Sequence, residues 1–242
     1  MAAFVSERQE AGIHRFQLKV GNHPHDDVAR TRAVVEVAEQ DTLIVADSNG
    51  GWNLRAAQVA VRGLADLPIF IEQPCRSTED SIFAMRHSAL PLILDESIVT
   101  QQDVFHAKNV AGAVSINIKI SRVGGLTQAA HMRDLMHELD MMVTAAVSHL
   151  AASTRPENFQ NASFMNEGTD GHVAGYSPRS VGGRGSAPDG PGLGIEVNVE
   201  GLDVVFSVTD GVELTPFSTT PTDQFSRTGR FLPHEPGEQA SK

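Results

Sequence analysis

The sequence of 242 residues predicts an α/β protein with a parallel sheet, and two observations support this. Short apolar runs alternate with longer helical patterns, and strands joined by helical crossovers pair in parallel. The apolar runs are also continuous, as is typical of strands that are covered on both faces. An open doubly wound sheet and a (β/α) barrel both satisfy these observations.

Twelve elements follow in order after an N-terminal segment that has the character of a helix end. The apolar, β-rich runs predict strands over 16–20, 43–47, 69–74, 92–96, 113–120 and 141–144. The helical patterns between and after them predict helices over 26–40, 53–66, 77–87, 100–109, 126–140 and 145–153. The helix over 77–87 opens with Ser-x-x-Asp, which is a capping pattern.

The composition excludes several classes of protein. A formal net charge of −11 argues against nucleic-acid binding, which needs a basic surface. No apolar run approaches ~18 residues, so no membrane-spanning helix is expected. Cys75 is the only cysteine, which excludes an internal disulfide and suits the cytoplasm, the location that we expect.

The sequence changes character after Thr154. Residues 155–195 are rich in Gly, Ser, Pro and Asn and predict an irregular loop region. We expect one domain over 1–212 and a disordered tail over 213–242, because the tail has little apolar material.

Ionisable residues recur at the ends of successive predicted strands. Lys19, Asp47, Glu72, Asp95 and Lys119 are 28, 25, 23 and 24 residues apart, which is about the length of one βα unit. The carboxyl ends of parallel strands are where α/β proteins build their sites. A lone strand-end Asp is most often a helix cap, and a lone Lys is most often solvated, but the regular recurrence favours a shared site.

The three carboxylates predict a metal site. Asp47, Glu72 and Asp95 would repel one another if brought together without compensation. An all-oxygen set suits Mg²⁺, with Mn²⁺ as the alternative, whereas zinc calls for His or Cys. Lys19 and Lys119, at the first and fifth strands, would then face each other across a substrate as an acid/base pair.

The motifs at these positions resemble the enolase superfamily, in particular the barrel domain of its mandelate racemase and muconate lactonizing branch. They are "FQLKVG", "VADSNGGW", "IEQP", "LDES" and "NIKISRVGGLT". The resemblance implies a modified (β/α)₇β TIM-type barrel with a separate capping domain. It also implies Mg²⁺-assisted removal of a proton α to a carboxylate, with the five residues in the roles given above.

Within that branch, "RFQLKVG", "IEQPC" and "KISRVGGLT" look most like enzymes of proline derivatives. These are hydroxyproline or proline-betaine epimerases and 3-hydroxyproline dehydratases, and the sequence does not separate epimerase from dehydratase. The partners implied are a small carboxylate substrate and, as an option, further copies of the chain in a homo-oligomer.

Three departures from the family pattern stand out. The capping domain and the first barrel strand are expected to be missing, so that the barrel is incomplete. The strand-end loop between Thr144 and Ala145 is short, and Gln17 stands where many relatives have the first lysine of a Lys-x-Lys pair. The alternative function is therefore a catalytically inactive, truncated barrel. A phosphate-binding doubly wound enzyme is a third option, but it lacks a glycine-rich loop after the first strand.

Overall fold

A computed structural model describes residues 1–145, 148–162, 181–192, 194, 208–209 and 213–214. The chain divides into two compact units, Met1–Glu196 and Val197–Lys242. In the second unit the described residues form one antiparallel pair, β8 (Val208–Thr209) and β9 (Glu213–Leu214). The tail expected over 213–242 otherwise lies outside the described residues.

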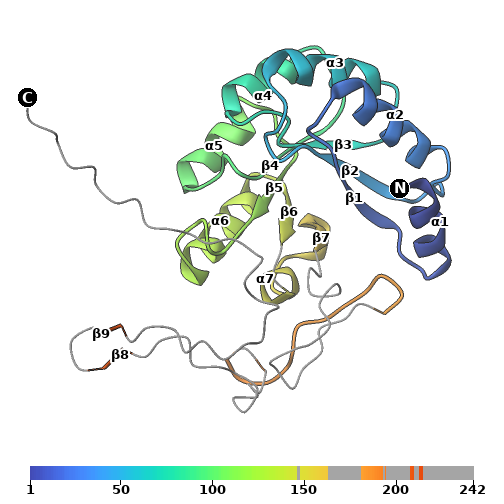
Figure 1. Cartoon of the computed structure of the whole chain (residues 1–242). Helices are drawn as coiled ribbons and strands as arrows, with labels where there is room; N and C mark the ends of the chain where they lie inside the picture. Colours follow the sequence, from blue (N-terminus) through green and yellow to red (C-terminus); the bar gives the residue numbers. More distant parts are fainter. Residues whose placement is uncertain (146–147, 163–180, 193, 195–207, 210–212, 215–242) are drawn as a thin grey trace, which may run out of the picture. The chain divides into compact units, whose positions relative to one another are not determined.

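The first unit contains a curved sheet of seven parallel strands in the order β1-β2-β3-β4-β5-β6-β7 (Figure 1). The strands are β1 (Arg15–Lys19), β2 (Leu43–Asp47), β3 (Phe70–Glu72), β4 (Leu92–Leu94), β5 (Ser115–Ile118), β6 (Met142–Ala145) and β7 (Phe159–Ala162). Strands in sequence order with helices between them are the arrangement of a TIM-type barrel. Within the described residues β1 and β7 are the two edges, so the fold is that of an incomplete barrel, as expected.

Helices lie along the outer face of the curved sheet (Figure 1). They are α1 (Ala2–Glu10), α2 (Pro24–Val35), α3 (Leu54–Leu64), α4 (Thr78–Met85), α5 (Gln101–Asn109), α6 (Leu126–Glu138) and α7 (Ser148–Ala152), with a 3₁₀ turn at Pro156–Asn158. Side-chain caps begin three of them: Asn53, Ser77 and Thr100 each accept a hydrogen bond from a backbone N–H in the first turn. The capping pattern predicted at Ser77 is thus confirmed.

Three local predictions are wrong. Ala145, expected to begin a helix over 145–153, is the last residue of β6, and α7 covers Ser148–Ala152. Strand β7 falls inside 155–195, where an irregular loop was expected. The helix expected over 26–40 ends at Val35, where the β-branched residues Val34, Val35 and Val37 weaken helical preference. The residues after Val35 instead form turns that lead into β2.

The alternation of side chains along β1 separates the core from the site. Phe16 and Leu18 are buried in the hydrophobic core that joins the sheet to its helices. Gln17 and Lys19 lie on the other face and line a cavity on the concave side of the sheet. The end of β1 therefore contributes one polar face to the interior of the barrel.

A buried carboxylate fixes the loops that follow β1 and β2. Asp27 accepts hydrogen bonds from the backbone N–H groups of Gly21 (3.0 Å) and Asn22 (2.9 Å) and from Trp52 Nε1 (2.9 Å), and it pairs with Arg30. Gly21 has φ 103°, and a Cβ there would collide with the backbone oxygen of Ser48. The two loops are thus locked together directly beyond Lys19 and Asp47.

The exchange Asp27→Asn should lower the free energy of unfolding by about 3 kcal/mol, because it weakens several charge-assisted hydrogen bonds of a buried group at once. Urea denaturation followed by fluorescence measures this, since Trp52 is the only tryptophan and one of the affected partners. Asp26→Asn is the matched control, since Asp26 is exposed and should change stability by less than about 0.5 kcal/mol. Equal effects of the two exchanges would refute the anchoring role of Asp27.

Candidate active site at the carboxyl ends of the strands

The structure places the three predicted metal ligands side by side at the carboxyl ends of consecutive strands. Asp47 and Glu72 are the last residues of β2 and β3 and are paired in register, and Asp95 directly follows β4. All three are 0–1 % exposed. Sheet geometry thus holds three carboxylates in one buried cluster, which we call the carboxylate trio.

Both predicted lysines contact this trio, from its opposite ends. Lys19 is the last residue of β1, and its Nζ donates to Asp47 Oδ2 (2.5 Å). Lys119 directly follows β5, and its Nζ donates to Asp95 Oδ2 (2.6 Å) and lies 3.6 Å from Glu96 Oε1. The structure therefore brings together all five residues that the sequence predicted to share one site.

Two side-chain amides separate the carboxylates. Gln17 Nε2 donates to Asp47 Oδ2 (3.0 Å) and Glu72 Oε2 (2.8 Å). Asn117 Nδ2 donates to Glu72 Oε1 (3.1 Å) and lies 3.4 Å from Asp95 Oδ2. Each amide thus bridges two like charges and reduces their repulsion.

Two residues in the loops after β2 and β3 have unusual backbone conformations. Asn49 and Gln73 have φ values of 48° and 36°, in the left-handed region that few residues other than glycine adopt. Asn49 Oδ1 accepts from Lys19 Nζ (2.9 Å), and its Nδ2 donates to Glu96 Oε1 (3.1 Å). Gln73 Oε1 accepts from the backbone N–H of Asp95 (2.9 Å). These hydrogen bonds hold the strained backbone in place. They also connect the side-chain amides of Asn49 and Gln73 to residues of the site.

The electrostatics of the trio favour protonation of its central member. Burial raises the pKa of Glu72 to about 7, and the charge of Asp47 adds to the rise, against hydrogen bonds from Asn117 and Gln17. Burial also raises the pKa of Asp47, although its hydrogen bond with Lys19 opposes this. The chain's own cations therefore do not fully neutralise the buried carboxylates.

A cavity of about 1230 Å³ opens on this cluster. Its lining includes both lysines, Asp47, Asp95 and the two bridging amides. Phe159 and Asn161 of β7 line it on the side opposite β1, together with the segment 182–187. The volume is ample for a small carboxylic acid.

The chemistry of the donor set fits a hard divalent cation. All the donors are oxygens, the trio carries uncompensated negative charge, and Asn117 Oδ1 is buried without a hydrogen-bond partner among the described residues. The oxygens of the trio do not all lie within 4.8 Å of one another, and the side-chain amides of Gln17 and Asn117 lie between neighbouring carboxylates. A cation would therefore take the place of these internal donors.

Sequence reasoning gave no role to three residues that contact the trio. Gln17 and Asn117 lie two positions before Lys19 and Lys119, so each shares a face of its strand with the lysine. The alternation of side chains along a strand could therefore have identified both amides. Arg122 Nη1 donates to the backbone oxygen of Asp95 (2.7 Å) and to its carboxylate. The Arg122 contact arises from the turn after β5, which strand periodicity does not describe.

Residues 1–201 match the family model described as Enolase C-terminal domain-like. The chain belongs to this family. It is 39% identical over 207 residues to the cis-3-hydroxy-L-proline dehydratase of Roseibium aggregatum, covering 81% of this chain and 56% of that protein. The N-succinyl-L-Arg/Lys racemase of Bacillus cereus is 33% identical over 147 residues, which are 58% of this chain and 38% of that protein.

Solved structures show the same relationship. A mandelate racemase/muconate lactonizing enzyme from Roseovarius nubinhibens ISM is similar with a TM-score of 0.79 and 31% identity, over 84% of this chain and 58% of that chain. Another from the same organism, solved in complex with magnesium, has a TM-score of 0.76 and 27% identity, over 82% of this chain and 60% of that chain. The resemblance to the mandelate racemase branch is thus confirmed. The chain spans a little more than half the length of the dehydratase and of these two solved structures.

Among the described residues, no helix combines the length and the apolar character that crossing a membrane requires.

In the absence of divalent metal, the melting temperature should fall as the pH rises from about 4.5 to about 7. In this window the folded chain keeps a proton on Glu72 that the unfolded chain has already released, so raising the pH favours unfolding. Glu72→Gln removes this titration and should flatten the fall, and the difference between the two proteins isolates Glu72. Identical pH profiles in EDTA would contradict the shifted pKa.

Proposed function

We propose that this chain forms the site of an enzyme that removes the proton α to the carboxylate of a small amino-acid-like acid. The outcome is racemisation, epimerisation or dehydration. Lys19 and Lys119 act as the acid/base pair, and Asp47, Glu72 and Asp95 hold Mg²⁺, with Mn²⁺ as an alternative. The enzymatic relatives and the magnesium complex of a structural neighbour support the proposal.

The observation that carries it is the placement of the lysines. They come from β1 and from the end of β5, they flank the trio, and they line the same cavity. A substrate between them presents one face of its α-carbon to each ammonium group. One lysine in its neutral form takes the α-proton, and the other returns a proton or assists a leaving group.

The remaining residues orient this chemistry. Bound Mg²⁺ would supply positive charge to hold the substrate carboxylate and stabilise the charge that develops as the proton leaves. Asn49 holds the Lys19 ammonium, and Asp95 with Glu96 holds that of Lys119. Arg122 fixes Asp95 through both its backbone and its carboxylate.

Dehydration of a cyclic hydroxy amino acid is the reaction that we favour. The dehydratase relative is 39% identical over 81% of this chain, and its name specifies a hydroxyl on the carbon next to the α-carbon. Loss of the α-proton to one lysine and of hydroxide, protonated by the other, forms a carbon–carbon double bond and releases water. The same two lysines serve epimerisation if no hydroxyl is present to leave.

A catalytically inactive, truncated barrel is the second candidate. Within the described residues β1 and β7 are edge strands that do not pair with each other, and a side-chain hydrogen bond from Arg15 Nη1 to the backbone oxygen of Gln160 (2.5 Å) connects them. Unpaired strand edges and a cavity between them allow water to reach the site, which weakens electrostatic stabilisation.

Lys19→Ala and Lys119→Ala should each lower turnover of a 3-hydroxyproline about 100-fold or more, the usual contribution of a general acid or base. The assay uses Mg²⁺ in D₂O and follows α-proton exchange and the unsaturated product by NMR. Lys108→Ala is the matched control, because Lys108 lies on α5 and contacts the backbone oxygen of Asp140, away from the cavity.

Exchange that persists after loss of both lysines would overturn their catalytic assignment. A folded, magnesium-binding chain without exchange on any proline derivative would favour the inactive barrel instead. The small carboxylate partner, a homo-oligomeric state and a cytoplasmic location remain predictions from the sequence.

A further inference from the structure

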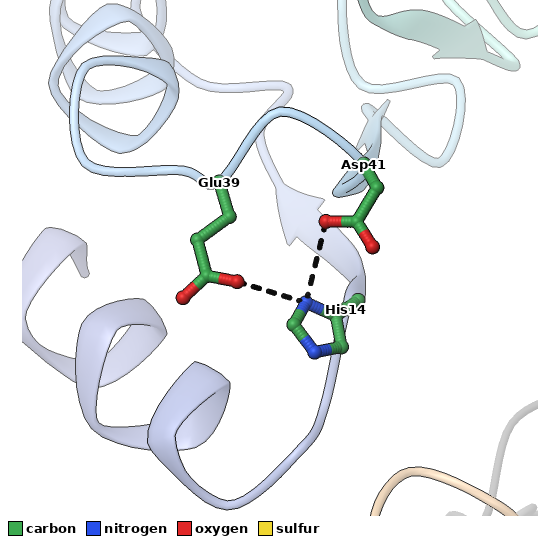
Figure 2. A group of neighbouring side chains, drawn as sticks. All are labelled: His14, Glu39 and Asp41. Carbon is green, nitrogen blue, oxygen red and sulfur yellow. Dashed lines mark ion pairs between the residues drawn. The ribbon is translucent and has the colours of Figure 1, made fainter.

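A second cluster of metal-ligating side chains lies at the amino ends of β1 and β2, the opposite ends from the carboxylate trio. His14 directly precedes β1, and Glu39 and Asp41 lie in the connection between α2 and β2. Figure 2 shows the three side chains turned toward one another, with the imidazole between the two carboxylates. We call these three residues the His14 cluster.

The distances in this cluster are those of ligands around an ion. His14 Nδ1 lies 3.5 Å from Glu39 Oε2 and 3.8 Å from Asp41 Oδ1, and one ligand atom of each residue lies within 4.8 Å of the other two. Two ligands at about 2.1 Å from a tetrahedral ion are ~3.4 Å apart. Hydrogen bonds are shorter, at about 2.7–3.2 Å.

One ligand atom of the cluster lacks a hydrogen bond. The His14 side chain is 34% exposed, but its Nδ1 is buried and has no hydrogen-bond partner among the described residues. Buried polar atoms are nearly always paired in native proteins, so an orphaned ring nitrogen that faces two carboxylates indicates a missing partner. A cation is the partner that accepts electron pairs from the nitrogen and both oxygens together.

The backbone holds the ligands in fixed positions. The backbone N–H of Leu43 donates to the backbone oxygen of His14 (2.8 Å), which continues the pairing of β1 with β2. The backbone N–H of Thr42 donates to the backbone oxygen of Glu39 (3.0 Å), which closes the turn that carries both carboxylates. The cluster therefore joins edge strand β1 to the loop before β2.

We propose that His14, Glu39 and Asp41 bind a divalent ion of the zinc class, at a site separate from the carboxylate trio. One imidazole nitrogen with two carboxylates suits Zn²⁺ and Co²⁺, whereas Mg²⁺ prefers oxygen ligands throughout. Glu39 and Asp41 are largely exposed, so the ion keeps water in its remaining positions. The ion acts as a cross-link at the edge of the sheet, and the proposal does not depend on the proposed enzymatic function.

Cobalt(II) tests the proposal, because its visible absorption reports its ligands. The full chain is stripped of metal with EDTA, dialysed, and titrated with Co²⁺ in excess Mg²⁺, so that Mg²⁺ competes with Co²⁺ for the all-oxygen carboxylate trio. We expect one Co²⁺ per chain, displaced by Zn²⁺, and a rise in melting temperature. His14→Ala should weaken Co²⁺ binding at least about tenfold, because it removes the only nitrogen ligand.

Three further variants make the result specific. Asp47→Asn alters the trio, and His131→Ala removes an exposed histidine of α6, so both should keep the wild-type Co²⁺ affinity. Glu39→Gln changes an exposed ligand and decides the question if His14→Ala does not fold. The absence of Co²⁺ binding in excess Mg²⁺ would overturn the proposal and leave an ion pair only. Unchanged affinity in His14→Ala or Glu39→Gln, or loss in Asp47→Asn alone, would overturn it equally.

Discussion

The burial of three carboxylates side by side is the constraint on which the rest of this structure depends. Register pairing of β2 with β3 places Asp47 beside Glu72, and the end of β4 adds Asp95. Like charges in such a setting are costly unless compensated. The bridging amides of Gln17 and Asn117 and the two lysine ammonium groups are therefore requirements of the buried charge as well as parts of a site. Burial still raises the pKa of Glu72 to about 7, so a further positive charge beside it would stabilise its ionised form.

The loops beyond the strands convert this charged cluster into a defined geometry. Asp27 ties the loop after β1 to Trp52 in the loop after β2, and Gln73 binds the backbone of Asp95. Asn49 and Gln73 have strained, left-handed backbone conformations. Contacts with the surrounding structure stabilise these conformations, because the residues do not favour them on their own. Hydrogen bonds among the loop residues thus fix the positions of the lysines and carboxylates, as is required of a pre-organised site.

The repeating βα units could be predicted from the sequence. The irregular turns and the last strand of the parallel sheet could not. Strand β2 has the bounds that were expected, and the five candidate residues lie together as their spacing predicted, because one βα unit fixes the height of each strand end. Strand β7 was missed because "FQNA" carries a single large apolar residue and is defined by pairing with β6. Arg122 and the His14 cluster were missed because turns bring their side chains together, and no periodic pattern describes a turn. The left-handed conformation of Gln73 is likewise imposed by its surroundings.

Thermal unfolding with and without millimolar Mg²⁺ tests the central claim most directly, namely that the strand ends assemble into one metal-binding cluster. A ligand that binds only the folded state stabilises it by RT ln(1+[L]/Kd), about 2.7 kcal/mol at 100 times Kd. The account predicts a cooperative transition that rises with Mg²⁺ in the wild-type chain and loses that rise in Asp47→Asn. A transition that is independent of Mg²⁺, or that rises equally in the variant, would contradict it.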